Sequence, residues 1–580
     1  MRVQKEFERQ CVDAVSRAVS EMGVDPGDLP VEVPDGADLA IPCFVLAKPL
    51  GMSPVRIAEE IARRISVPSG LISGLTPLNG YLNFTVDSAA IVADVIGEVT
   101  RRGADFGKSS ATGLRMNVEH TSTNPTGPVH VGRARNPIIG DTLARCLRMR
   151  GHDVTTEYYI NDVGKQVVTM TWGAKNVSES EAEAEREQSE NPDYREKVDH
   201  RLVYNYRVAT KRIHGNASLE GEIAEMVRRY EAGDEETRRA VRQVAEAMLG
   251  GINESLALIN VRIDRYTWES DFILNGATKA IVDRLKGTGY SRRSEDGAWY
   301  LDLKGFGIHG KNTDFTFIRS DGTTLYTTRD LAYHEDKFSR SDRVIDVLGE
   351  DQKLGSKQLC CALEILGEEK RPEPLFYAFV SLPEGKMSTR MGTVVYLDDL
   401  VDESVARAYE EIRKRRADIP EGRMREIARV VGAGAVRYNI VRVHADKQIV
   451  FRWEDALNFD GNSGPYLQYT YARACSIIRK AGDFERDIDA AKLSDEYEVK
   501  LAKALAKFEA VLADIDATKR VNILPAYGHE VAAAFNQFYA EVPVLQASAE
   551  REARLTLVEC ARTVLGNVLG CLGMEAPEEM

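Results

Sequence analysis

Apolar residues in the first hundred positions follow two different periods, which predicts a small unit built from helices and strands. Segment 53–65 predicts a helix with Ser53 as its N-cap and a proline at its first position, and segment 80–86 alternates like a strand. An earlier helix is predicted by five apolar residues at helical spacing: Phe7, Cys11, Val15, Val19 and Met22. We therefore expect a small α+β domain over residues 1–108.

From residue 114 onward, short apolar runs alternate with amphipathic stretches. Segments 114–120 and 153–162 have the pattern of strands, and segment 133–151 between them has the pattern of a helix that ends at Gly151. A strand, a glycine-bearing loop, a helix and a strand form a βαβ unit, whose crossover implies a parallel sheet. Further strand-like runs follow at 298–303, 314–319, 343–349 and 375–380.

Two long parts of the chain lack the strand pattern. Residues around 170–265 are mostly helical and polar, which predicts an insertion, and amphipathic segments dominate beyond Asp398. The chain is therefore predicted to have an α/β fold with a Rossmann-like parallel-sheet domain over 109–400 that carries the helical insertion. An all-α domain is expected over 401–580.

Charge changes this picture only locally. The formal net charge is −14, which argues against a nucleic-acid partner if the charge is spread evenly. It is not: residues 178–200 carry nine acids against three bases, whereas residues 401–480 carry fifteen Lys/Arg against eleven Asp/Glu. The acidity is concentrated in one predicted solvated insertion, so an RNA-binding face in the C-terminal part stays open.

Composition also indicates the cellular compartment and whether metal-binding sites are expected. The first residues are charged and polar, no apolar stretch reaches the length of a membrane span, and the eight cysteines form no CxxC pair or Cys/His cluster. We expect a cytoplasmic protein with reduced thiols, no membrane partner, no metal-ligating residues and no structural zinc.

Two short motifs carry the candidate chemistry. In "TGPVHVGRARN" (126–136), His130 and Gly132 lie between a predicted strand and a predicted helix, whose N-terminus attracts phosphate. In "GKMSTRMG" (385–392), Lys386 and Arg390 lie between two glycines. Each motif alone is also consistent with a solvated surface loop. Together they favour a nucleotide-phosphate site.

The pair "HVGR" and "KMSTR" resembles the signature motifs of class I aminoacyl-tRNA synthetases. Four stretches in order along the chain resemble the arginyl-tRNA synthetase family of the archaeal kind: "VEHTSTNPTGPVHVGRARNPIIGDTLARCL", "DGTTLYTTRDLAYH", "GKMSTRMG" and "SGPYLQYTYARACSI". The resemblance implies ATP-dependent attachment of arginine to its tRNA through an arginyl-adenylate, with Mg²⁺ entering with ATP. Domain 109–400 would be catalytic, and 1–108 and 401–580 would contact the tRNA.

The resemblance also implies residue roles. His130, Arg133 and Lys386 would be catalytic, and ATP would bind through His130, Gly132, Arg133, Lys386, Ser388 and Arg390. Two positions depart from the family pattern. Arg133 stands where a second histidine is usual, and Thr389 stands where a second lysine is usual. Some family members carry a compensating lysine before the first motif, but Gly127 occupies that position here. We expect Arg133 to supply the missing cation, since guanidinium binds phosphate well.

An arginine pocket needs carboxylates, because a guanidinium–carboxylate pair supplies both energy and geometry. The resemblance assigns the substrate arginine to five residues: Glu119, Asn124, Tyr326, Asp330 and Gln352. Glu119 as a rim charge, and Asp330 as the ion-pair partner of Arg329 or Lys337, are the alternatives. For tRNA the resemblance points to one helical face with Tyr466, Tyr469 and Arg473, although spacing alone favours a core stripe there.

Two other functions remain open from the sequence. A small-molecule nucleotidyltransferase would share the phosphate site but would not require the 180 C-terminal residues. A non-catalytic, synthetase-like RNA-binding protein would explain the motif departures at Arg133 and Thr389. The partners expected for a synthetase are L-arginine and arginine tRNA, with the chain acting as a monomer.

Overall fold

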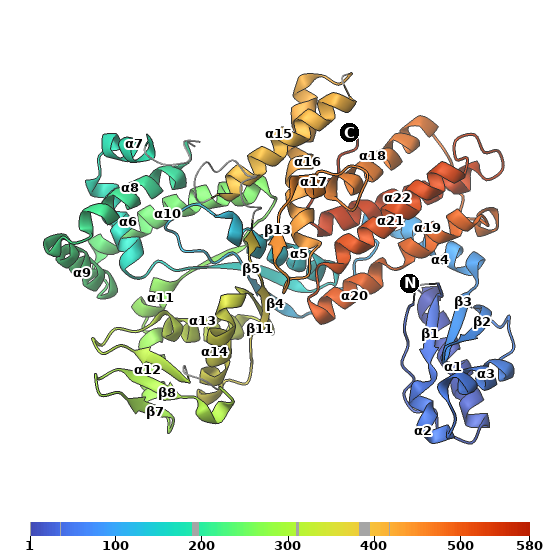
Figure 1. The fold of residues 1–580 in the computed structure, drawn as a ribbon, viewed down its shortest axis with the longest axis horizontal. Helices are drawn as coiled ribbons and strands as arrows, with labels where there is room; N and C mark the ends of the chain where they lie inside the picture. Colours follow the sequence, from blue (N-terminus) through green and yellow to red (C-terminus); the bar gives the residue numbers. More distant parts are fainter. Residues whose placement is uncertain (1, 35, 188–195, 309–312, 382–394, 417) are drawn as a thin grey trace.

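The computed structural model describes residues 2–34, 36–187, 196–308, 313–381, 395–416 and 418–580. The N-terminal unit is a three-stranded antiparallel sheet, in the order β1-β3-β2, with helices packed against it (Figure 1). Ser53 caps α3 by accepting a hydrogen bond from the backbone N–H of Arg56, as predicted. Its main elements are α1 (Arg2–Glu21), β1 (Leu39–Pro42), α2 (Ala47–Leu50), α3 (Pro54–Arg64), β2 (Ile72–Leu78), β3 (Tyr81–Val86) and α4 (Ser88–Arg102).

The centre of the molecule is a sheet of five parallel strands in the order β11-β10-β4-β5-β6. In chain order this is 5-4-1-2-3, the Rossmann arrangement, and it has its topological switch point between β4 and β10. The strands are β4 (Arg115–Glu119), β5 (Asp153–Ile160), β6 (Arg265–Trp268), β10 (Arg343–Gly349) and β11 (Glu373–Tyr377). The helix α5 (Arg135–Met149) connects β4 to β5, and α14 (Lys353–Ile365) connects β10 to β11.

Two insertions interrupt the parallel sheet. The first lies between β5 and β6 and is entirely helical in the part that the structure describes: α6 (Lys165–Asn176), α7 (Glu179–Glu187), α8 (Val198–Ile213), α9 (Ala217–Glu231) and α10 (Glu235–Leu258). The second lies between β6 and β10. Its strands β7 (Ser291–Arg293), β8 (Trp299–Asp302) and β9 (Asp314–Ile318) form a separate antiparallel sheet, at the lower left of Figure 1. Helices α11 (Glu269–Leu274), α12 (Ala277–Lys286) and α13 (Tyr326–Arg340) flank it.

Beyond the second signature motif the chain is nearly all helical, as predicted. The helices are α15 (Leu397–Arg415), α16 (Glu421–Val441), α17 (Trp453–Ala456), α18 (Gly464–Ala481), α19 (Glu496–Ala506), α20 (Phe508–Thr518), α21 (Ile523–Glu541) and α22 (Arg551–Cys571). One two-residue strand, β13 (Ile449–Val450), departs from the prediction and pairs in parallel with β12 (Val380–Ser381). The α/β fold class is confirmed.

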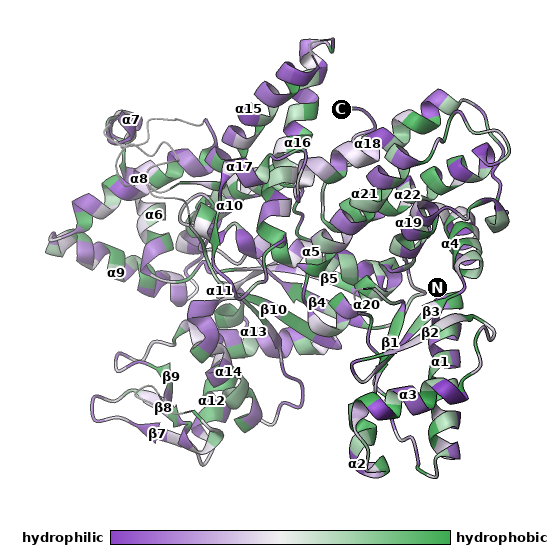
Figure 2. Cartoon of the chain, turned by 45° about the vertical axis from the view of Figure 1, so that its right-hand side comes forward, coloured by the Kyte–Doolittle hydropathy of each residue, from purple (hydrophilic) through white to green (hydrophobic). Residues whose placement is uncertain are grey.

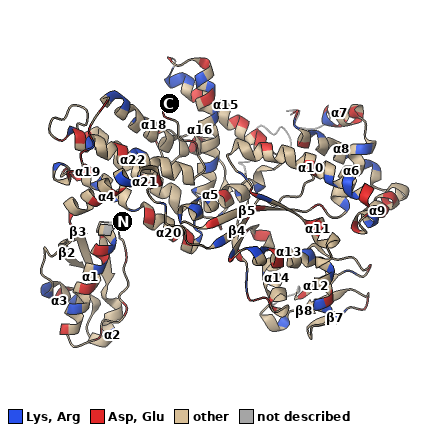
Figure 3. Ribbon diagram, turned by 180° about the vertical axis from the view of Figure 1, so that it is seen from behind, with Lys and Arg blue, Asp and Glu red and all other residues tan. Residues whose placement is uncertain are grey.

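Apolar side chains hold these parts together, and polar ones cover the outside. Figure 2 shows the hydrophobic colour concentrated on the central strands and on the facing sides of the C-terminal helices, whereas α7 and α9 are largely hydrophilic. In Figure 3, basic and acidic residues lie close together along α15. Much of this charge is paired one helical turn away, as between Arg407 and Glu403 or Arg413 and Glu410. No helix in the described ranges is both long and apolar enough to cross a membrane.

Two buried arginines connect the helical region to α5. Arg437 of α16 is 1% exposed at its side chain and donates to the Asp141 carboxylate of α5 at 2.6 Å and to the carbonyl of Leu572 at 2.6 Å. Arg135, in the first turn of α5, donates to carbonyl oxygens in two segments beyond the central strands: residue 378 and residues 443, 444 and 447. The helix that follows the first signature motif is therefore fastened to the C-terminal part of the chain.

Candidate functional site

The first signature motif lies at the carboxyl end of β4, where ligands bind in open α/β sheets with a switch point. His130 caps a short turn of 3₁₀-helix that precedes α5, and its Nδ1 accepts a hydrogen bond from the backbone N–H of Gly132 at 3.0 Å. Because Nδ1 is an acceptor, the ring proton of the neutral imidazole lies on Nε2. Burial and the Arg133 charge lower the pKa of His130, so the neutral form is favoured. The motif thus presents one N–H donor.

Gly132 is required by the conformation of His130. A Cβ at position 132 would lie 2.8 Å from Cε1 and 3.1 Å from Nδ1 of the imidazole, closer than such atoms pack. Any side chain there would displace the histidine ring. The glycine therefore has a structural reason besides the predicted role of admitting a flat base.

The chain that follows the second signature motif runs beside the first. The backbone N–H of Val131 donates to the carbonyl of Val395 at 2.9 Å, and that of Leu397 donates to the carbonyl of Val129 at 2.7 Å. This pairing brings segment 395–397 against the loop that carries His130. Lys386, Ser388 and Arg390 themselves lie outside the described residues, as does Thr389, and their roles remain predictions.

Arg133 and Arg135 are not equivalent positions. Arg133 is exposed, and its guanidinium makes no hydrogen bond or ion pair with any residue that the structure describes, which leaves it available to a ligand. Arg135 is completely buried and donates to four carbonyl groups. Arg135 therefore belongs to the interior of the fold and not to the surface of the helix. The spacing of the motif could not show that its second arginine turns inward.

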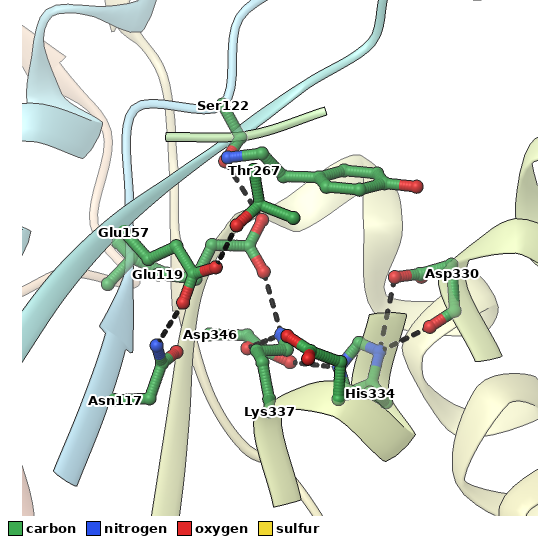
Figure 4. A network of polar contacts seen from close by, with 12 residues as sticks. Asn117, Glu119, Ser122, Glu157, Thr267, Asp330, His334, Lys337 and Asp346 are labelled. Carbon is green, nitrogen blue, oxygen red and sulfur yellow. Dashed lines mark hydrogen bonds and ion pairs between the residues drawn. The ribbon is translucent and has the colours of Figure 1, made fainter. Parts of the chain in front are cut away.

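A cluster of charged side chains joins the end of β4 to β10 and α13 (Figure 4). We call it the carboxylate cluster: Glu119, Asp330, His334, Lys337 and Asp346. Glu119, at the end of β4, is 8% exposed; its Oε2 accepts from Lys337 Nζ at 2.8 Å and its Oε1 from Ser122 Oγ at 2.8 Å. The alternative that Glu119 is a rim charge is therefore wrong.

Asp330 is the most open carboxylate of the cluster. Its side chain is 27% exposed, and its Oδ1 lies 3.1 Å from Nδ1 of His334, one turn further along α13. The alternative ion-pair partners proposed from sequence are engaged elsewhere. Arg329 pairs with the buried Glu269, and Lys337 pairs with Glu119 and Asp346. Asp330 therefore keeps one carboxylate oxygen without a partner among the described residues.

The remaining predicted arginine-binding residues lie around the same edge of the sheet and are exposed. Tyr326 begins α13 one turn before Asp330 and is 57% exposed. Asn124, in the loop after β4, donates weakly to Gln166 at 3.4 Å, and Gln352 precedes α14 after β10. All three side chains are accessible from solvent.

Sequence reasoning missed the inner part of the cluster. His334 and Lys337 follow Asp330 at spacings of four and seven, so one face of a predictable helix carries all three. Asp346 is a single acid within an otherwise apolar strand, which is also a visible signal. Ser122 gave no signal, because one serine in a polar loop is unremarkable until the fold places it against Glu119.

The predicted RNA-contacting face of α18 is partly exposed: Tyr469 is open to solvent, whereas Tyr466 and Arg473 are half-buried, and the Arg473 guanidinium donates to Asn536 of α21. The Arg473 guanidinium lies 4.8 Å from the ring centroid of Tyr469, which is 39% exposed. Tyr466 is half-buried and accepts a hydrogen bond from Asn536 of α21 at 3.0 Å. The three side chains share one face, as the spacing predicted.

One group in the described part of the chain offers metal-ligand atoms: Asp199, His200 and Asp398, within 4.8 Å of one another and all buried. The ammonium of Lys197 lies 3.0 Å from Asp398 Oδ1 and 2.6 Å from Ser255 Oγ, and His200 Nε2 lies 2.9 Å from Asp398 Oδ2. The Lys197 ammonium therefore already lies between the two carboxylates of this group, and these contacts tie the helical insertion to the start of α15.

Three family models cover nearly the whole chain. Residues 98–453 match the model described as "tRNA synthetases class I (R), catalytic domain", residues 7–86 match the arginyl tRNA synthetase N terminal domain, and residues 467–580 match the DALR anticodon binding domain. The arginine–tRNA ligase of Methanocella arvoryzae is 44% identical over 98% of each chain, and that of Methanothermobacter thermautotrophicus is 38% identical over 99% of each. The chain belongs to the arginyl-tRNA synthetase family.

Solved structures agree with this assignment. The arginyl-tRNA synthetase of Thermus thermophilus superposes with a TM-score of 0.80 at 28% identity, over 99% of this chain and all of that one. The arginyl-tRNA synthetase of Plasmodium falciparum shares the fold, with a TM-score of 0.77 at 17% identity. The sequence resemblance to the arginyl-tRNA synthetase family is thus confirmed across all parts of the chain.

Proposed function

We propose that this chain attaches L-arginine to arginine tRNA in two steps. In the first, a carboxylate oxygen of arginine attacks the α-phosphate of ATP, a P–O bond to pyrophosphate breaks, and arginyl-adenylate forms. In the second, a terminal ribose hydroxyl of the tRNA attacks the adenylate carbonyl, loses its proton and displaces AMP. The observations that support this most directly are a His130 donor in the loop after β4 and a buried carboxylate cluster that includes the last residue of β4, in a member of this family.

The residues present suit these steps. Nε2–H of His130 would donate to the phosphate that gains charge in the transition state, and the exposed Arg133 guanidinium would add a cation there. Mg²⁺ would enter with ATP and neutralise its phosphates. We assign pyrophosphate and ATP contacts to Lys386, Ser388 and Arg390 from the motif alone.

The arginine side chain would bind between Asp330 and Glu119. Asp330 offers an oxygen that has no partner among the described residues, and each oxygen of Glu119 has one further lone pair, so the two can receive the planar fork of donors. Asn124 and Gln352 would orient the amino and carboxylate ends, with Tyr326 at the rim. Tyr466, Tyr469 and Arg473 would receive unstacked tRNA bases.

We further propose that domain 1–108 contacts tRNA, that 109–400 carries the catalysis and that 401–580 binds the anticodon. The monomeric state and the cytoplasmic location remain predictions from the sequence. The nucleotidyltransferase alternative is not favoured, because family models match both flanking regions as synthetase domains.

The test is ATP–pyrophosphate exchange and aminoacylation with arginine and its tRNA. We expect both activities with arginine and not with lysine. His130→Ala should lower the activation rate about a hundredfold or more, as loss of one transition-state donor does. An active chain in which His130→Ala raised only the KM for arginine would contradict the role of His130. A folded chain that binds tRNA without either activity would support the non-catalytic alternative.

A further inference from the structure

The carboxylate cluster contains more acids than one arginine can neutralise. Glu119, Asp330 and Asp346 approach one another from β4, α13 and β10, and two of them are almost completely buried. Three negative charges in a dry site repel one another strongly, so carboxylates in such a group take up protons unless cations hold them ionised.

Two buried cations lie among these acids. Lys337 is completely buried, donates at 2.8 Å to both Glu119 and Asp346, and directs its ammonium at the Tyr333 ring, 4.3 Å from the centroid. All three ammonium donor directions are therefore used inside the protein. Lys337 is too enclosed to contact a substrate, and its charge acts on Glu119.

His334 is a second cation, as its partners show. Nδ1 lies 2.8 Å from the backbone carbonyl of Asp330, and Nε2 lies 2.9 Å from Asp346 Oδ2. Neither a carbonyl nor an ionised carboxylate can donate, so both ring nitrogens must carry a proton. Burial and Lys337 lower the pKa of His334, but the Asp330 and Asp346 carboxylates outweigh them and raise it to about 10.

The other charged groups around the cluster form ion pairs of their own. Glu157 of β5 is paired with Arg340, at 2.6 Å, and Glu269 of α11 is paired with Arg329. Three acids and two cations are therefore left, with a net charge of −1. A neutral site results when one monocation enters.

We propose that Lys337 and His334 are positioning residues of the arginine site, whose two buried charges keep Glu119 and Asp330 ionised and leave the site with a single negative charge for one substrate cation. This inference rests on the proposed function. Lys337 matters most for Glu119, because its ammonium donates directly to Oε2 at 2.8 Å. Burial and the Asp346 and Asp330 charges raise the pKa of the Glu119 carboxyl group above its ordinary value, and the Lys337 ammonium is the cation that limits this rise. Without Lys337, Glu119 takes up a proton and stops accepting from the guanidinium.

The variant that tests this is Lys337→Met, which keeps length and removes charge. Arginine can then bind fully only when Glu119 releases its proton. Calorimetric titration with arginine at neutral pH, in two buffers of different ionisation enthalpy, should show about one proton released by the variant and almost none by the wild type. The acid limb of kcat/KM for arginine should move to higher pH by about one unit or more, while the KM for ATP stays within about twofold.

Three further variants complete the experiment. Lys337→Arg keeps the charge and should restore proton-neutral binding, and His334→Gln should shift the acid limb in the same direction as Lys337→Met. Lys370→Met is the matched control, because the Lys370 ammonium lies near the end of the same helix but donates to the carbonyls of Phe338 and Ser341. In this variant the acid limb of kcat/KM for arginine should not move. His334→Gln keeps the test decisive if Lys337→Met does not fold.

The inference would be overturned if Lys337→Met and His334→Gln both lost kcat/KM equally at every pH and released no proton on binding arginine. Lys337 and His334 would then have a structural role only. A wild-type protein that neither binds arginine nor charges tRNA would instead refute the proposed function itself. The two failures are therefore distinguishable.

Discussion

Asp330 differs from the other acids of its cluster in having an oxygen that no described side chain uses. Asp330→Asn removes a charge-assisted contact with the guanidinium while the amide keeps the shape. We expect the KM for arginine to rise roughly tenfold to a hundredfold, which corresponds to one hydrogen bond to a charged group. The KM for ATP should change little, and citrulline, a neutral isostere, should become a relatively better substrate.

Asp336→Asn is the control, since Asp336 lies on the same helix but pairs with Arg340 at 2.9 Å. If Asp330→Asn and Asp336→Asn behaved alike, Asp330 would be one more structural ion-pair member. Arginine recognition would then rest on Glu119.

Gly132 and Gly127 allow a second comparison within one loop. Gly132→Ala places a Cβ 2.8 Å from the His130 ring, whereas Gly127→Ala meets only a Val203 methyl group at an ordinary 3.5 Å. We expect Gly132→Ala to lower the activation rate about tenfold or more, because it displaces the His130 donor. Gly127→Ala should stay near wild type. Equal rates for the two variants in ATP–pyrophosphate exchange would show that the His130 conformation is not limiting.

At the scale of elements, the hydrophobic periods predicted most of what is found. The βαβ unit, the helical insertion and the helical C-terminal part follow from the spacing of apolar residues. The antiparallel sheet β7–β9 did not follow, because the strands at 298–303 and 314–319 look the same whether they extend the parallel sheet or form their own. Strand partners are set by packing between distant segments, which a local pattern does not contain.

The candidate site also has one part that local motifs predict and another that they do not. His130, Glu119 and Asp330 could be found from motifs, whereas the pair of Glu119 with Lys337 joins residues 218 positions apart. The buried state of Arg135 depends on carbonyls more than 240 residues further on. Such partners become visible only when the chain is folded.

The two arginines at the start of helix α5 give a separate prediction, because Arg133 is exposed and Arg135 is buried. Arg135→Ala leaves four carbonyl groups without their donor and should lower the free energy of unfolding by roughly 3–5 kcal/mol, as loss of a buried charged partner does. Arg133→Ala should leave that free energy nearly unchanged and lower the activation rate. Denaturant unfolding and ATP–pyrophosphate exchange measured on both variants separate these effects. A stable Arg135→Ala protein would contradict the anchoring role.

At the scale of the whole molecule, Asp398 connects the helical insertion to the C-terminal helices. Burial raises the pKa of Asp398, but the His200 hydrogen bond and the Lys197 charge outweigh it and lower this pKa to about 2. A carboxyl group with a depressed folded pKa contributes stability that is present above its unfolded pKa of about 3.9 and is lost as the pH falls toward 2.

Lys197→Met should therefore destabilise the protein most at neutral pH. We expect a loss of roughly 3–5 kcal/mol for an unpaired buried charge, or less where Asp398 takes up a proton. The difference from wild type should shrink as the pH falls from about 7 to about 3, measured by denaturant unfolding at each pH. A difference that is independent of pH would mean that Lys197 acts through packing and not through its charge.

The backbone pairing of residues 129–131 with 395–397 has a consequence for how the protein is made. As the chain leaves the ribosome, all five strands of the central sheet are complete by residue 377, and each can find its neighbour. The loop that carries His130 still lacks the segment 395–397 that pairs with it, and Arg135 still lacks the carbonyls at 443, 444 and 447. A nascent or prematurely terminated chain that ends before residue 397 thus has the sheet without a shaped phosphate loop. Synthesis that stops early should leave fragments that do not compete with finished molecules for ATP.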